Sequence, residues 1–264
     1  MTTGKVPEAA EDQSLSSIDV FAKLALTYGK FPGCLILAEG RDKIVKFFEY
    51  FNKLCAWYFL RRNAEVSVSY FLVSEKTREA RQMFRLLKSL FEYKRIQLIA
   101  SSSTDRFSKV TNMLSRSFYL LHWLFENIYI VSKNCNLQYI WPKFPLDRCR
   151  KLSRGFWLLG LALFLVYCCK TLRKTYTDES DLKVAALNKM TVRQVKENLK
   201  IICKLRHDYW LNFSRAMLDF FICLNENDLP FLVLGKRLSP GVEGSFGMFS
   251  AAIYLFGLKR VILP

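Results

Sequence analysis

Residues 74–95 carry the pattern that most restricts what this chain can fold into, because apolar side chains recur there at helical spacing and cations fill the opposite face. At 100° per residue, a helix over this segment places its apolar side chains on one narrow stripe. Such a helix suits an anionic membrane surface, where the stripe enters the lipid and the cations contact headgroups. The apolar stripe consists of Ala80, Met83, Phe84, Leu87, Leu90 and Phe91. The basic face consists of Arg78, Arg81, Arg85, Lys88 and Arg95.

An ordinary surface helix that packs its stripe on a protein core would show the same pattern, so the rest of the chain must decide. The chain has 264 residues, is 51% hydrophobic and carries a net charge of +17. This combination favours a polyanionic partner, either a membrane surface or a nucleic acid. The aromatic residues fall on apolar faces of predicted helices, where they cannot stack on bases. We therefore expect an anionic phospholipid membrane as the partner and no nucleic acid.

Helical periodicity also dominates outside this segment. Residues 41–60 predict a helix with one apolar face, whose other face carries Asp42, Lys46, Glu49 and Lys53. The only strand-like segment, at 66–73, has no second strand to pair with, so we assign it to a loop or a helix. The fold class predicted is an all-α, membrane-associated protein with several amphipathic helices and one or two hydrophobic membrane segments.

The chain divides into three predicted regions. The first is a disordered tail, because its residues are small, polar and lack an apolar period. The second is an amphipathic helical region that includes the membrane-binding helix. The third contains two hydrophobic segments on either side of one long helix. The tail covers residues 1–16, and the amphipathic region covers 17–150 and contains a short helix at 18–28, the strand-like segment at 66–73 and the helix at 74–95. The C-terminal region covers 151–264 and contains apolar segments at 155–169 and 244–258 and a long helix at 181–225.

Residues 155–169 are uncharged and are bounded by Arg154 and Lys170. At about 1.5 Å per residue they cover roughly 22 Å, which is short of a hydrocarbon core of about 30 Å. The span becomes long enough if both cations extend toward the headgroups. A buried core helix would show a similar run, but Trp157 and Tyr167 lie near its ends as interface anchors do. We therefore predict a transmembrane helix.

The second apolar segment, at 244–258, follows a stretch rich in proline and glycine that predicts a flexible connection. Gly247 and Ala251 are four residues apart, a spacing that lets two helices approach closely. We predict that this segment is a second span or the hairpin partner of the first.

The sequence shows no arrangement of residues typical of catalysis. Its two histidines, His122 and His207, fall on separate predicted helices and are interpreted as structural. The cysteines have no metal-ligand or redox spacing, and the glycines near the C-terminus lack the strand and the lysine of a phosphate-binding loop. The expectation is a protein that is not an enzyme, with no cofactor and no metal.

The order of these elements resembles the peroxin-11 family of peroxisomal membrane proteins. The likeness covers most of residues 20–258 and rests on patterns more than on single residues. The resembling segments are Gly40-Arg41-Asp42-Lys43 with the helix start at 44–51, Phe84-Arg85-Leu86-Leu87-Lys88, the apolar run at 155–165 with Leu172-Arg173-Lys174, and Tyr209-Trp210-Leu211 with Met217-Leu218-Asp219.

This resemblance implies a protein of the peroxisomal membrane, or of a specialised relative such as the glycosome, that acts in elongation, division and abundance of the organelle. It implies that the basic amphipathic helix inserts into the cytosolic leaflet and bends it. It further implies self-association as a homo-oligomer, and constriction by dynamin-related fission machinery and its adaptors. Members of the family have also been proposed to conduct small metabolites. The alternative function is therefore a metabolite channel built from the two apolar segments and the polar faces of neighbouring helices.

Overall fold

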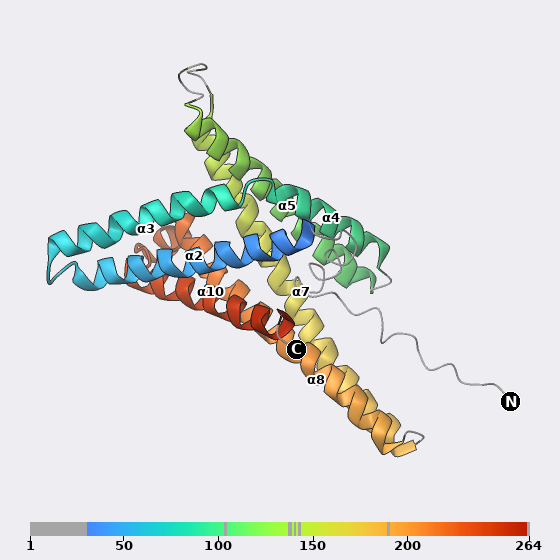
Figure 1. Cartoon of the computed structure of the whole chain (residues 1–264). Helices are drawn as coiled ribbons and strands as arrows, with labels where there is room; N and C mark the ends of the chain where they lie inside the picture. Colours follow the sequence, from blue (N-terminus) through green and yellow to red (C-terminus); the bar gives the residue numbers. More distant parts are fainter. Residues whose placement is uncertain are drawn as a thin grey trace.

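The structure is a computed structural model that describes residues 31–102, 105–136, 139, 141, 144–188 and 191–262. Within these residues every long element is a helix and there is no strand, which confirms the all-α prediction (Figure 1). The predicted tail at 1–16 and the predicted short helix at 18–28 lie outside the described residues. The helices are α2 (Phe31–Phe59), α3 (Ala64–Phe84), α4 (Lys88–Ser101), α5 (Arg106–Asn134), α7 (Leu146–Asn188), α8 (Val192–Glu226), α9 (Leu229–Leu234) and α10 (Pro240–Ile262).

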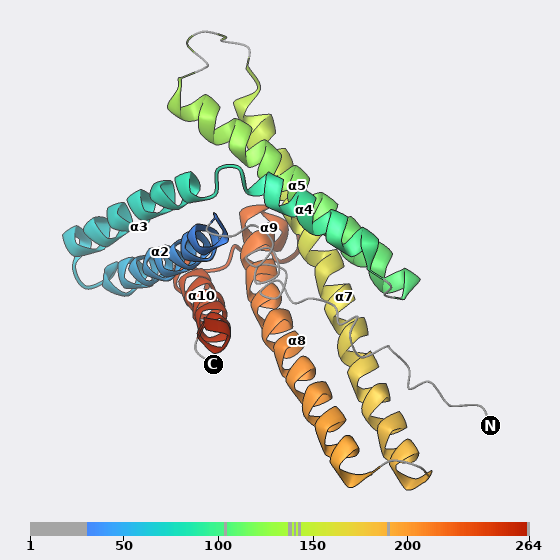
Figure 2. The ribbon, with the colours of Figure 1, turned by 45° about the vertical axis from the view of Figure 1, so that its right-hand side comes forward.

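The helices pack as three groups. Helix α2 lies between α3 and α10 and contacts both, which makes a layer of three long helices (Figure 1). Helices α4 and α5 pack on each other, and α5 packs along α7. Helices α7 and α8 form a long hairpin whose tip extends away from the other helices (Figure 2). Helix α10 also contacts α8, so the hairpin and the three-helix layer are joined.

The single helix predicted over residues 74–95 is wrong. Helix α3 ends at Phe84 and α4 begins at Lys88, and the chain changes direction between them (Figure 2). Leu87 lies at the break with φ 62°, a left-handed conformation that costs a residue with a side chain roughly 1–2 kcal/mol. The helical periodicity continues across the break, which is why the sequence pattern does not reveal it.

The long helix predicted at 181–225 is also wrong in its start. Helix α7 continues to Asn188, and α8 begins at Val192. The backbone N–H of Thr191 donates to Oε1 of Gln194 at 3.3 Å, which is half of a capping box. The segment 66–73 is helical within α3, as the loop-or-helix assignment allowed.

Three glycines explain how closely α10 approaches α2. The flexible connection predicted before residue 244 ends earlier than expected, because α10 already begins at Pro240. A Cβ added at Gly247 would lie 2.1 Å from the ring of Tyr50, and one at Gly241 would lie 2.5 Å from the ring of Trp57. One at Gly244 would lie 3.0 Å from backbone atoms of α2. Only residues without a side chain permit this packing.

One described helix, Leu146–Val184 within α7, is long and apolar enough to cross a membrane. Only 33% of its apolar window is buried inside the protein, whereas the core helix of a soluble protein would be mostly covered. This helix contains the predicted span at 155–169. The predicted second span at 244–258 does not meet the same criterion in its described part.

Helices α3 and α4 bury polar side chains and expose apolar ones. Their buried residues are Ser67, Ser74, Arg81, Glu92 and Arg95. Many of their apolar side chains are exposed, and with few exceptions a soluble protein would turn that face inward. The exposed apolar side chains of the two helices are Val68, Phe71, Leu72, Val73, Met83, Phe84, Leu90, Tyr93 and Leu98.

Candidate functional site

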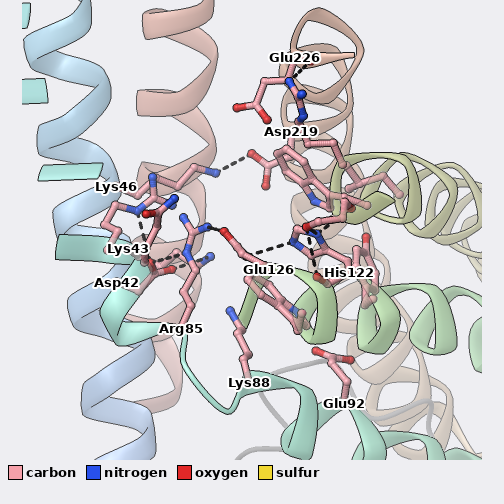
Figure 3. Close-up of a pocket in the computed structure, with 18 of the residues that line it drawn as sticks. Asp42, Lys43, Lys46, Arg85, Lys88, Glu92, His122, Glu126, Asp219 and Glu226 are labelled. Atoms are coloured by element: carbon pink, nitrogen blue, oxygen red, sulfur yellow. Dashed lines mark hydrogen bonds and ion pairs between the residues drawn. The ribbon is translucent and has the colours of Figure 1, made fainter. Parts of the chain in front are cut away.

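The polar faces of six helices meet around a cavity of about 210 Å³. Its lining comes from α2, α3, α4, α5, α7 and α8, and it contains eleven lysine and arginine side chains but only six carboxylates. Figure 3 shows that these groups converge from different helices, with Lys46 and Asp42 on one side and Asp219, His122 and Glu126 on the other. The cavity is therefore an ionic interior with an excess of positive charge.

Asp42 holds the first group of ion pairs. Its carboxylate accepts from Nε of Arg81 at 3.3 Å and from Nε of Arg85 at 3.1 Å, and Nζ of Lys43 lies 3.5 Å away. Burial alone would raise the pKa of Asp42, but Arg85, Lys43 and Arg81 together hold it well below its usual value. Asp42 is therefore ionised at neutral pH and fixes α3 to α2.

Ion pairs also join the end of α3 to α5. Arg85 also donates to Glu126 at 3.4 Å, and Glu126 lies 3.5 Å from Nε2 of His122. The other ring nitrogen of His122 is 2.9 Å from the carbonyl oxygen of Ser153 on α7. Burial is the main cause that lowers the pKa of His122, so the ring is neutral at pH 7. The interpretation of His122 as a structural residue fits this geometry.

A second group joins α2 to α8 and α10. Nζ of Lys46 donates to Oδ1 of Asp219 at 2.6 Å and to Oγ of Ser250 at 2.9 Å, and Ser250 donates to the same carboxylate at 2.6 Å. Lys53 pairs with Glu243 at 2.5 Å in the same layer. Each of these charges is compensated by a partner on another helix, as buried ions must be.

The predicted basic face therefore does not form an outward surface. Arg81 and Arg95 are buried, and Arg78, Arg85 and Lys88 are partly buried; all five line the cavity. Arg81 pairs with Glu49 as well as with Asp42. The expectation that these cations are free to contact headgroups needs correction, because carboxylates on α2, α4 and α5 bind several of them inside the protein.

The predicted apolar face is on the outside, as expected for a membrane-inserting surface. The exposed fractions are 53% for Met83, 46% for Phe84, 63% for Leu87 and 58% for Leu90, and Phe91 is half-buried. These residues surround the break between α3 and α4. Their contact with lipid stays a prediction.

Sequence reasoning missed the carboxylates that bind the basic face. Asp42, Lys46 and Glu49 were expected on a polar face at helical spacing, which is the pattern of a solvated helix surface. Glu126 and His122, four residues apart in a hydrophobic run, were the available signal for a buried polar group on α5.

In the described part of the chain, a helical fold with an ionic interior, apolar outer faces and a candidate span defines a membrane-associated helical protein. The family model for peroxisomal biogenesis factor 11 (PEX11) matches residues 34–258, and the chain belongs to this family. The resemblance inferred from the sequence is thereby confirmed. The chain is a peroxisomal membrane protein of a family involved in peroxisome proliferation, which is not a known enzyme family.

Two relatives extend this result. Peroxisomal membrane protein PMP30A of Candida boidinii is 23% identical over 167 residues, which cover 60% of this chain and 61% of that protein. The peroxisomal membrane protein 11 homolog of Dictyostelium discoideum is 24% identical over 237 residues, which cover 83% of this chain and 89% of that protein. No solved structure matches the chain.

Proposed function

We propose that the protein bends and elongates the peroxisomal membrane, and so promotes fission, by inserting the apolar side chains around the α3–α4 break into the cytosolic leaflet. The observation that carries this proposal is the exposure of Met83, Phe84, Leu87 and Leu90, which follow one another in sequence around the break. Volume added to one leaflet expands it relative to the other and favours positive curvature.

The gain from insertion is moderate. Full burial of a side chain of this size is worth about 1.5–3 kcal/mol. Because the four side chains are already roughly half covered, their insertion supplies about 3–6 kcal/mol per molecule. This is enough for reversible binding but not for shaping a tubule with one copy. Self-association is therefore part of the proposal, and so is a subsequent step by dynamin-related fission machinery and its adaptors.

The ionic interior changes the role proposed for the cations. Arg81 and Arg85 can contact anionic headgroups only if their pairs with Asp42 and Glu49 open and α3 moves away from α2. Breaking such buried pairs costs several kcal/mol. We infer that insertion uses the apolar surface while these pairs stay closed, so its dependence on lipid charge should be weak.

The test uses full-length protein reconstituted into vesicles of peroxisome-like composition and observed by electron microscopy. The variant Met83→Gln, Phe84→Gln, Leu87→Gln, Leu90→Gln should abolish tubules while the protein still reconstitutes. A matched control replaces three exposed apolar residues near the tip of the α7–α8 hairpin, Val184→Gln, Val192→Gln and Ile201→Gln, and should tubulate normally. Equal tubulation by both variants would eliminate the proposal.

A second candidate function, a channel for small metabolites, is favoured by the charged cavity enclosed by helices with apolar outer faces. Ala216 lies on this cavity and is 3% exposed, so Ala216→Trp would fill it. The expected result is a lower conductance in planar bilayers for Ala216→Trp and an unchanged conductance for the four-residue variant above. Conductance that is the same in wild type and Ala216→Trp would argue against a pore through this cavity.

A further inference from the structure

We propose that the cavity is a binding site for a small anion that carries one or two phosphate groups, held by Lys88, Arg150, Arg154 and Arg215. This inference does not depend on membrane insertion, because it rests on the interior of the helix assembly rather than on its apolar outer face.

The charges that line the cavity do not balance. Eleven cations face six carboxylates in the described lining, so an excess of positive charge is enclosed between the helices. Lys88, Arg154 and Arg215 are partly buried and Arg150 is exposed, and like charges that line one cavity repel each other unless a counter-charge neutralises them. An anionic ligand with more than one charge supplies that counter-charge.

Only some cations of the described lining carry this excess positive charge. Asp42, Glu92 and Asp219 are each held by a cation at 3.3 Å or less, so they are not free to neutralise others. Lys88 and Arg215, in contrast, have no carboxylate oxygen within 4 Å in the described part of the chain. The same is true of Arg150 and Arg154, which lie one turn apart on α7.

The contacts that these four cations do make leave their donors available. Nζ of Lys88 lies 4.5 Å from the ring centre of Trp123, and the guanidinium groups of Arg150 and Arg215 lie 5.6 Å and 5.2 Å from tyrosine rings. A ring orients a cation but accepts few of its hydrogen bonds. Arg154 donates one bond, at 2.6 Å, to the carbonyl oxygen of Glu226, while its buried Nε has no acceptor among the described residues.

The chemistry of the ligand follows from the donors and the size. Arginine presents two parallel N–H groups that match the oxygens of phosphate, and a lysine adds a point charge. The cavity is smaller than the roughly 300–1,000 Å³ of sites for drug-sized molecules. It therefore fits a phosphate or diphosphate group rather than a whole nucleotide. That group can be a free anion or the headgroup of a lipid such as a phosphoinositide.

The test measures binding to full-length protein in neutral nanodiscs by isothermal titration calorimetry. Inorganic diphosphate is the soluble probe, and neutral nanodiscs with and without a phosphoinositide provide the lipid arm, read by thermal shift. The binding variant is Lys88→Gln, Arg150→Gln, Arg215→Gln, which removes no hydrogen bond between described residues. Its control, Arg148→Gln, Lys151→Gln, Arg173→Gln, loses the same charge from exposed positions of α7 outside the cavity.

We expect one diphosphate to bind per chain and the binding variant to weaken it by on the order of tenfold or more, with the control unchanged. A thermal shift by the phosphoinositide alone, lost in the same variant, would assign the site to a lipid headgroup. Binding of neither probe to the wild type, or equal binding by the variant and its control, would overturn the proposal. Circular dichroism of all proteins, and a variant with Arg150→Lys and Arg215→Lys that should retain binding, exclude misfolding as the cause of a loss.

Discussion

The α7–α8 hairpin and the α2–α3 pair bury opposite kinds of side chains. The hairpin contains an apolar core that includes Leu161, Phe164 and Leu172. Helices α2 and α3 instead bury an ionic network around Asp42 and Arg81, and expose apolar residues. The hairpin is therefore held together by ordinary hydrophobic packing, whereas the pair is held together by charge compensation in its interior.

Removing an aromatic ring from the hairpin core should have the largest effect on stability. Phe164→Ala should lower the free energy of unfolding by about 3–5 kcal/mol, measured by denaturant titration in detergent, because a buried ring leaves a cavity. Phe249→Ala on α10 is the control, since that ring is 56% exposed, and it should change stability by less than about 1 kcal/mol. Equal losses in the two variants would mean that α7 and α8 do not form the core described.

Removing one charge from the ionic network should be almost as costly, although no apolar area is lost. Asp42→Ala leaves Arg81 and Arg85 without their shared partner and should cost about 3–5 kcal/mol in the same assay. The exposed Asp181 serves as the control, and Asp181→Ala should be nearly neutral. If Asp42→Ala is equally neutral, the interior of the α2–α3 pair is hydrated and the contrast with the hairpin is lost.

A methyl group on α10 tests how closely the layer is packed. Gly247→Ala places a Cβ against the Tyr50 ring and should destabilise the protein by about 1–3 kcal/mol. Gly155→Ala on α7 meets nothing within 4 Å and should stabilise by about 0.5–1 kcal/mol, because alanine favours a helix over glycine. The opposite signs are the result to look for in thermal unfolding; two stabilising changes would contradict the close approach of α10 to α2.

The smallest expected effect is the pH dependence of the Asp42 pairs. The folded pKa of Asp42 lies well below its unfolded value of about 3.9, so folding is favoured by the ionised form. The stability that Asp42 contributes is fully present above about pH 4 and is lost as the pH falls through the folded pKa. The difference in unfolding free energy between the wild type and Asp42→Asn should therefore be constant from pH 7 to 5 and shrink below about pH 4. A difference that grows on acidification would contradict the ion pairs.

Local patterns were sufficient to predict the all-α class and the family, but not where several helices begin and end. The spacing of apolar residues predicted the part of α2 after residue 41 and the apolar run of α7, and Gly247 with Ala251 indicated the close approach of a helix. Met83, Phe84 and Leu87 of the predicted apolar stripe are exposed, and their contact with lipid stays a prediction.

The direction in which polar faces point could not be predicted in the same way. A helix with one charged and one apolar side has the same periodicity whether the charged side meets water or other helices. Arg81 and Arg85 lie inside because Asp42 and Glu126, 39 and 41 residues away in sequence, supply counter-charges across helices. Such long-range pairing leaves no local signal, and neither does the break at Leu87, which interrupts the helix without proline or glycine.

The most direct test of this account asks which environment surrounds the break between α3 and α4. The photoreactive residue p-benzoylphenylalanine is placed at Leu87, or at the exposed Arg193 near the hairpin tip, and the protein is reconstituted with phospholipid that carries labelled acyl chains. We predict strong crosslinking to lipid from position 87 and little from position 193. No lipid adduct at position 87, with a normally folded protein in the bilayer, would contradict the inserted apolar surface on which the account rests.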